Sequence, residues 1–162
     1  MKIGIISDTH GYINPKVFSL FEGVELILHA GDIGTIDIVT SLEALAPLKA
    51  IHGNIDTFPL STRYPQVLGL EIHGVGICLI HQFISIKNSI IQQEVSQLPS
   101  KKLDVVICGH SHDAKLQRMD EVLVFNPGSA GKPRFSLRPA VGMLTISENG
   151  WYTPEIIYLD EK

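Results

Sequence analysis

The sequence predicts an α/β protein with mixed β-sheets. Strand and helix patterns alternate over the first half of the chain, and hairpin patterns dominate after residue 114. In addition, His, Asp or Asn side chains follow several short apolar segments directly or within a few residues. The 162 residues contain no internal repeat and no linker-like tract, so we expect one domain spanning residues 1–162.

Three short apolar segments alternate with helical patterns in the first half. Asn14 and Pro15 are typical of a helix start, and the spacing of Ile38, Val39 and Leu42 is helical. The expected elements are strand Lys2–Ser7, helix Pro15–Glu22, strand Val24–His29, helix Thr35–Ala46 and strand Leu48–His52.

The second half begins with a loop that contains two prolines and continues into a hairpin, a helix and further strands. Turn signals such as Asn149-Gly150 separate the C-terminal strands. The expected elements are strands Gln66–Ile72 and Gly76–Ile80, helix Lys87–Leu98, and strands Asp104–Cys108, Lys115–Met119, Val122–Phe125, Val141–Ile146 and Trp151–Leu159.

Charge and cysteine usage exclude several classes of protein. The net charge is −4 and there is no dense Lys/Arg run, so we expect no stable nucleic-acid binding and no anionic membrane partner. Cys78 and Cys108 lie in apolar segments and form no CxxC pair. This pattern is typical of core thiols in a reducing compartment. Asp8 interrupts the first apolar segment too early for a signal peptide, and no segment approaches a membrane span. We therefore expect a cytoplasmic protein.

Seven side chains with metal-binding atoms follow the predicted strands. They are Asp8, His10, Asp32, Asn54, His81, His110 and His112. Ligands of open α/β sheets bind outside the carboxyl ends of the strands, so we expect these side chains to converge on one edge.

The chemistry of this set favours two divalent metal ions. Four imidazoles, two carboxylates and an amide oxygen favour Mn, Fe, Co, Ni or Zn over Ca or Mg, and no thiolate is present. Two divalent ions bring four positive charges and the two aspartates return two negative ones, so the centre keeps a charge near +2. Paired ions about 3.5–4 Å apart also clamp a phosphate during in-line displacement. An anionic phosphate ester is the expected substrate.

The motifs DTHG, GDIG, GNID, LIHQ and GHSH occur in this order along nearly the whole chain. They resemble the five motifs of the calcineurin-like metallophosphoesterases. The short length and the segment FNPGSAGKPR, residues 125–134, are similar to the small bacterial and archaeal phosphodiesterase branch. This resemblance implies two mixed β-sheets packed as a sandwich and flanked by helices.

The resemblance also implies a role for each matched residue. The first ion would be held by Asp8, His10 and His112, the second by Asn54, His81 and His110, and Asp32 would bridge the two. A hydroxide that bridges the ions would attack a small phosphodiester, such as a cyclic nucleotide or an activated aryl diester, and Asn54 would also touch the phosphate. Mn²⁺ or Ni²⁺ is the expected activating ion, and Fe, Co and Zn remain open.

Two positions depart from the family pattern. Larger members have a catalytic histidine where this chain has Ile55, which cannot donate a proton, so poor leaving groups should react slowly. Gln82 stands where the family usually has glycine, so its side chain could narrow the pocket.

Alternatives remain open for single residues. His29 and His52 are each either core histidines or hydrogen-bond partners of a ligand, and Asp56 is a surface or capping residue that could orient a neighbour. Residues 125–134 form either a tight turn with two solvated cations or a loop beneath the site. In the second case Lys132 or Arg134 would reach a substrate phosphate.

Alternatives also remain open for function. A non-catalytic interaction scaffold exists in this fold family, as in a retromer subunit, and a regulatory nucleotide-binding protein is a further option. Family analogy and edge strands near the C-terminus suggest a homodimer or a higher homo-oligomer.

Overall fold

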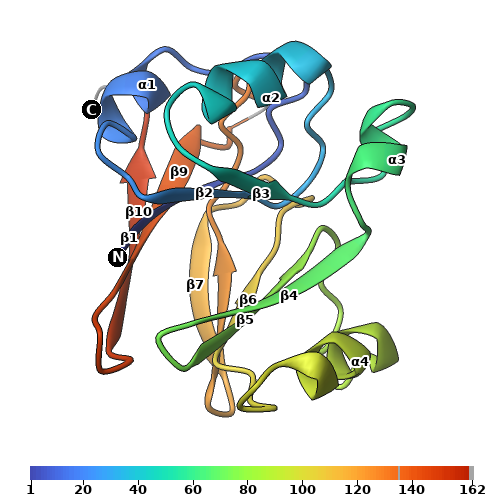
Figure 1. Ribbon diagram of the computed structural model, residues 1–162. Coiled ribbons are helices and arrows are strands. Elements are labelled where there is room, and N and C mark those ends of the chain that lie inside the picture. The colour runs from blue at the N-terminus through green and yellow to red at the C-terminus, as the bar shows by residue number, and fades with distance from the viewer. Residues whose placement is uncertain (135, 161–162) are drawn as a thin grey trace.

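Two five-stranded mixed sheets pack against each other in this computed structural model, which describes residues 1–134 and 136–160 (Figure 1). Apolar side chains from both sheets meet between them, including Ile3 and Ile5 from one sheet and Ile77 and Leu79 from the other. The predicted α/β class and the sandwich of mixed sheets are confirmed.

The first sheet contains the N-terminal strands and the C-terminal hairpin. Its order is β10 (Tyr152–Tyr158), β9 (Ala140–Ile146), β1 (Lys2–Ile6), β2 (Leu26–His29) and β3 (Leu48–Ala50). Strands β1, β2 and β3 are parallel, whereas β9 pairs with β1 in antiparallel register. The carboxyl ends of the three parallel strands therefore lie along one edge.

The second sheet repeats this arrangement with three other parallel strands. Its order is β4 (Val67–Ile72), β5 (Val75–Ile80), β6 (Val105–Ile107), β8 (Val122–Asn126) and β7 (Lys115–Met119). Strands β5, β6 and β8 are parallel, and β4 and β7 close the edges in antiparallel register.

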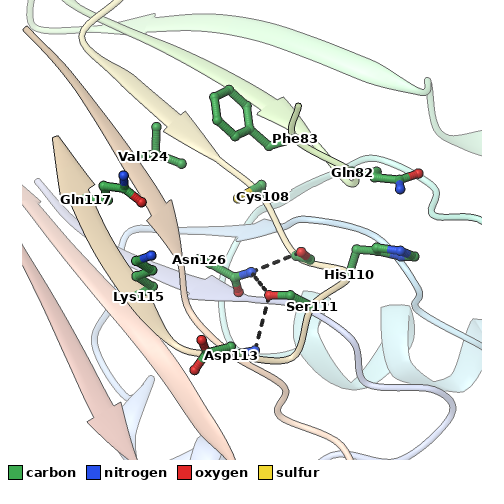
Figure 2. A pocket seen from close by; sticks show the side chains of 11 residues that line it. Gln82, Phe83, Cys108, His110, Ser111, Asp113, Lys115, Gln117, Val124 and Asn126 are labelled. Carbon is green, nitrogen blue, oxygen red and sulfur yellow. Dashed lines mark hydrogen bonds between the residues drawn. The ribbon is translucent and has the colours of Figure 1, made fainter. Parts of the chain in front are cut away.

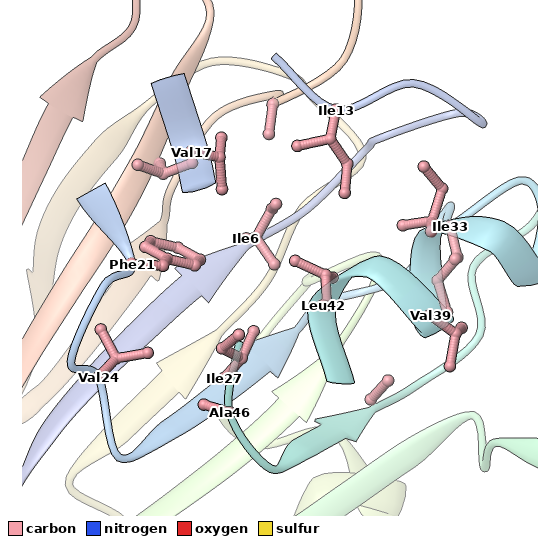
Figure 3. Packing of buried hydrophobic residues seen from close by; sticks show 14 of the residues in the cluster. Ile6, Ile13, Val17, Phe21, Val24, Ile27, Ile33, Val39, Leu42 and Ala46 are labelled. Atoms are coloured by element: carbon pink, nitrogen blue, oxygen red, sulfur yellow. The ribbon is translucent and has the colours of Figure 1, made fainter. Parts of the chain in front are cut away.

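Helices cover the outer faces of the sheets. Helices α1 (Lys16–Leu20) and α2 (Ile36–Glu43) lie over the first sheet, where Phe21, Leu42 and Ile6 belong to one buried cluster (Figure 3). Helix α4 (Ser89–Gln97) packs Ile91 and Val95 against the outer face of the second sheet. These buried faces follow from the helical spacing of the apolar residues.

The predicted elements occur in the predicted order, with shorter bounds at several ends. Helix α1 begins at Lys16, one residue later than expected, and Asn14 Oδ1 accepts a hydrogen bond from the Lys16 N–H. Helix α3 (Leu60–Arg63) was not predicted, because four residues are too few to show a period.

Candidate metal centre

The seven predicted side chains gather where the parallel strands of both sheets end. Asp8 and His10 follow β1, Asp32 follows β2, and Asn54 follows β3. His81 follows β5, and His110 and His112 follow β6. Backbone hydrogen bonds join the loops: Asp8 N–H donates to Gly31 O at 3.0 Å, and Gly109 N–H donates to His81 O at 3.0 Å.

A first cluster consists of Asp8, His10 and His112. One ligand atom from each lies within 4.8 Å of the other two. His112 Nε2 is 3.2 Å from Asp8 Oδ1, and His10 Nε2 is 3.3 Å from His112 Nε2. This group can supply three ligands to one ion.

A second cluster consists of Asp32, His81 and His110, again within 4.8 Å. His81 Nε2 is 3.2 Å from Asp32 Oδ2. The Asn54 side chain joins this cluster through a distance of 3.0 Å between its Oδ1 and His110 Nδ1. The structure therefore places Asn54 beside the second cluster.

The two clusters are adjacent. His10 Nε2 of the first cluster lies 3.6 Å from Asp32 Oδ2 of the second, and His81 Nε2 of the second lies 3.9 Å from Asp8 Oδ1 of the first. A carboxylate between two ion positions can share its oxygens between them, so the arrangement suits a paired centre.

Two buried side-chain atoms of the candidate ligands have no hydrogen-bond partner among the described residues. These atoms are Asp8 Oδ1 and His81 Nε2, and both face the clusters. The His81 Nδ1–H donates to Ala30 O at 2.7 Å, so the lone pair of the ring lies on Nε2 when the ring is neutral. A buried carboxylate oxygen without a partner is costly, and a bound cation removes that cost. The donor set thus fits divalent metal ions.

The electrostatics of the centre hold both aspartates ionised. Burial alone would raise the pKa of Asp8, but His10, His112 and Ser7 outweigh it and hold the pKa well below the usual range. Burial likewise opposes ionisation of Asp32, yet His81 and the Ile55 N–H lower its pKa. Carboxylates that are charged at neutral pH are the form that binds cations.

The backbone conformation at the ligands is unusual. Five of the seven candidate residues have a positive φ: Asp8 (53°), His10 (47°), Asp32 (54°), His110 (69°) and His112 (61°). Non-glycine residues rarely adopt this region, and such strain concentrates at functional sites. Backbone strain is thus concentrated where the donor atoms converge.

Glycines allow the ligand loops to approach closely. A Cβ at Gly109 would meet Ser7 Oγ, and it would lie 2.6 Å from Asp8 Oδ2. A Cβ at Gly53 would collide with the Asp32 carboxylate. The glycines of the GHSH and GNID motifs are therefore required by packing around the two aspartates.

Two of the open alternatives now have a structural answer. His29 is fully buried, its Nδ1 accepts from the Gly31 N–H, and its Nε2 lies 3.0 Å from Thr9 Oγ1. Burial lowers the pKa of His29 to about 4, so the ring is neutral and supports Thr9 between two ligands. Asp56 is also buried and accepts from the N–H groups of Ile33, Gly34 and Gly53. It ties the Asp32 loop to the Asn54 loop.

The segment 125–134 packs beneath the site, and two of its residues form contacts that were not predicted from the sequence. Asn126 Nδ2 donates to Gly109 O and to Ser111 Oγ, and thereby fixes the loop between the two late histidines (Figure 2). Ser129 Oγ donates to Asp8 O at 2.8 Å. The string NPGS, residues 126–129, was the signal for these contacts in the sequence. Lys132 and Arg134 line a small cavity with Asp8 and His10, so both lie beside the first cluster.

The two-sheet α/β fold and the two adjacent clusters of candidate ligands together make this chain a candidate metal-binding protein. The model of the calcineurin-like phosphoesterase superfamily domain matches residues 1–149, and the chain belongs to this superfamily. The resemblance inferred from the five motifs is confirmed.

Curated relatives carry matching descriptions. A probable metallophosphoesterase of Methanothermobacter thermautotrophicus is 38% identical over 152 residues, which cover 90% of this chain and 86% of the relative. A phosphodiesterase of Methanocaldococcus jannaschii is 30% identical over 144 residues, with 79% and 83% covered. These relatives support a phosphoesterase hydrolase.

Solved structures share the fold. A novel archaeal phosphodiesterase superposes with a TM-score of 0.75 at 28% identity and covers 97% of this chain and 100% of its own. Vps29 of Chaetomium thermophilum superposes with a TM-score of 0.72 at 17% identity, with 97% and 96% covered, and at that identity only the fold is shared. Within residues 1–134 and 136–160, no helix is long and apolar enough to cross a membrane.

Proposed function

We propose that this protein hydrolyses small phosphodiesters with two divalent metal ions. Asp8, His10 and His112 would hold the first ion, and Asn54, His81 and His110 the second. Asp32 would lie between the two. The buried, unpartnered Asp8 Oδ1 and His81 Nε2 are the observation that carries the proposal, since both atoms point where a cation would satisfy them.

Paired ions, when bound, would supply a hydroxide nucleophile at neutral pH and positive charge for the phosphate oxygens. The chain's own residues do the positioning. The His81 ring is fixed by its bond to Ala30 O, and Asp32 is fixed by the Ile55 N–H. Asn54 is exposed beside the second cluster, so its side-chain amide can also donate to a substrate oxygen.

The metal assignment follows the donor chemistry. Imidazoles with carboxylates suit first-row ions, and Mn²⁺ or Ni²⁺ is proposed as the activating ion, with Fe, Co and Zn as the other members of the class. Lys132 and Arg134 line the small cavity beside the first cluster, and their positive charges would attract the anionic substrate to the paired centre. Their charges and the two ions would offset the acidic balance of the chain.

Hydrolysis of bis(p-nitrophenyl) phosphate in MnCl₂ tests this function directly. We expect turnover by the wild type and a loss of at least about 100-fold in Asp8→Asn and His81→Ala, because removal of mere supporting partners of metal ligands already costs about 10–100-fold. Metal content measured by mass spectrometry should fall in the same variants. Equal rates in all three proteins would contradict catalysis and would leave the interaction scaffold as the function.

The proposed setting is a reducing cytoplasm with small-molecule substrates. Cys78 and Cys108 are both free and buried, and burial raises the pKa of each thiol to about 12. Such thiols are inert packing groups. Assembly into a homodimer or a higher homo-oligomer belongs to the same proposal and is tested by sedimentation.

A further inference from the structure

A pocket of about 380 Å³ opens beside the second cluster, on the outer face of the second sheet (Figure 2). Its walls come from the loops after β5 and β6 and from strands β7 and β8. His110 lines this pocket and also belongs to the second cluster. A molecule whose phosphate lies at the metal centre can therefore extend directly into the pocket.

The floor of the pocket is apolar. It contains the buried side chains of Cys108 and Val124 and the half-buried ring of Phe83. Val124 faces outward because side chains alternate along β8, where the neighbouring Leu123 and Phe125 belong to the core between the sheets. An apolar floor of this kind favours a flat, weakly polar group over a second phosphate.

The rim of the pocket carries amide groups that are free to bind. The side chains of Gln82 and Gln117 make no hydrogen bond to any other residue that the structure describes, and the Lys115 ammonium makes no ion pair within that part of the chain. Asn126 and Ser111 differ, because each is already bonded within the loop. Amides offer both donors and acceptors, which match the edge of a heteroaromatic ring.

Gln82 separates this pocket from a second one. It also lines a cavity of about 270 Å³ together with Asn54, His81 and Ile84. Two pockets thus diverge from the same cluster of candidate ligands, with the side chain that follows His81 between them. A phosphodiester has two ester arms, so two diverging pockets match its shape.

We propose that the pocket lined by Phe83, Val124 and Gln117 binds one ester arm of the substrate, and that this arm carries a planar heteroaromatic ring such as a nucleobase. The inference rests on the proposed function for the place of the phosphate. Phe83 and Val124 supply the apolar surface, and Gln82, Gln117 and Lys115 contact the edge of the ring.

Calorimetry in MnCl₂ with thymidine 5′-monophosphate and with methyl phosphate tests the pocket without any turnover. The wild type should bind the nucleotide roughly tenfold or more tightly than methyl phosphate, since contacts between a base and an aromatic side chain contribute about 1–3 kcal/mol. Phe83→Ala and Gln117→Ala should each reduce nucleotide affinity, by roughly fivefold or more, and leave methyl phosphate binding unchanged. Gln117 is exposed on β7, so its variant stays informative if Phe83→Ala fails to fold.

Phe18→Ala on α1 and Gln93→Ala on α4 are matched controls, because both side chains are exposed and line neither pocket. Both controls should keep the wild-type preference. Equal binding of the two probes, or a preference that survives both pocket variants, would overturn the inference. A nucleotide preference without hydrolysis of bis(p-nitrophenyl) phosphate would instead overturn the proposed function and leave the pocket assignment standing.

Discussion

The two ligand clusters differ in their access to solvent. In the first cluster the side chains of Asp8, His10 and His112 are only 0%, 18% and 10% exposed. In the second, Asp32 and His81 are buried, but His110 and the neighbouring Asn54 are exposed. The first cluster is therefore enclosed by protein, and the second opens to the surface.

This difference assigns different tasks to the two sides of the centre. Two pockets, of about 380 and 270 Å³, adjoin the second cluster, one at His110 and the other at His81 and Asn54. Catalytic metal sites keep a position open for water or substrate, whereas closed sites mainly hold their ion. Under the proposed function, the first cluster would mainly hold its ion and the second would admit the substrate.

The largest effect is expected where the two clusters meet. Asp32→Asn removes a negative charge 3.2 Å from His81 Nε2 and 3.6 Å from His10 Nε2. The rate on bis(p-nitrophenyl) phosphate should fall by more than about 100-fold, and the metal content should fall on both sides. Steady-state kinetics and mass spectrometry under native conditions measure the two losses.

Asp37→Asn is the matched control, since it makes the same chemical change at an exposed position in the first turn of α2. It should keep both the rate and the metal content of the wild type. If Asp32→Asn kept two ions and normal turnover, the two clusters would be independent of this carboxylate.

The next effect concerns the enclosed side and depends on pH. Burial lowers the pKa of His29 from 6.5 to about 4, so the folded protein favours the neutral ring. The contribution of the neutral His29 ring to the free energy of unfolding is fully present above pH 6.5 and is lost as the pH falls through about 4. It amounts to roughly 3 kcal/mol. Urea unfolding of the metal-free protein between these pH values should show this loss of stability. The His29→Gln variant should not show it.

His73→Gln provides the comparison, because His73 is exposed at the hairpin turn between β4 and β5. That variant should lose stability with acid as the wild type does. An unchanged pH dependence in His29→Gln would show that this ring does not support the enclosed cluster.

A smaller effect should separate the clusters themselves. His112→Ala removes a buried ligand of the first cluster, and His110→Ala removes an exposed ligand of the second. In calorimetric Mn²⁺ titrations, His112→Ala should weaken binding at the tighter site by roughly tenfold or more. His110→Ala should instead weaken binding at the weaker site by a similar factor. Loss of the same site in both variants would remove the distinction between enclosed and open sides.

Much of the fold was predictable because its patterns are local. Segments such as Lys2–Ile6 and Val105–Ile107 are short apolar runs that end at polar loops, and α2 has clear helical spacing. Helix α3 was missed because it has only four residues. The order of strands within the sheets was not predicted from the residues, since pairing such as β1 with β9 joins segments that are distant in sequence.

The site was predictable as a set of donors but not as a geometry. The position of each donor after a strand indicated convergence, and the structure brings all seven together. The positive φ angles, the Asn126 bonds and the three N–H groups held by Asp56 depend on how the loops pack across the two sheets. No single motif encodes that packing. The difference in exposure between His110 and His112 has the same origin.

The smallest effect is expected at Ile55, on the open side of the centre. The residue is 40% exposed, and its N–H donates to Asp32 Oδ1. Ile55→His keeps this backbone bond and adds a group that can donate a proton to a departing oxygen. We expect the kcat/KM for diesters with alkoxide leaving groups to rise relative to the kcat/KM for those with p-nitrophenolate. The rise should be smaller than the roughly 100-fold that a fully positioned acid supplies. Ile55→Gln, of similar size but without the acid, should leave the ratio of kcat/KM values for the two leaving groups unchanged. If both variants gave the wild-type ratio, the substrate would not place its leaving group near Ile55, and the open side would serve only for entry.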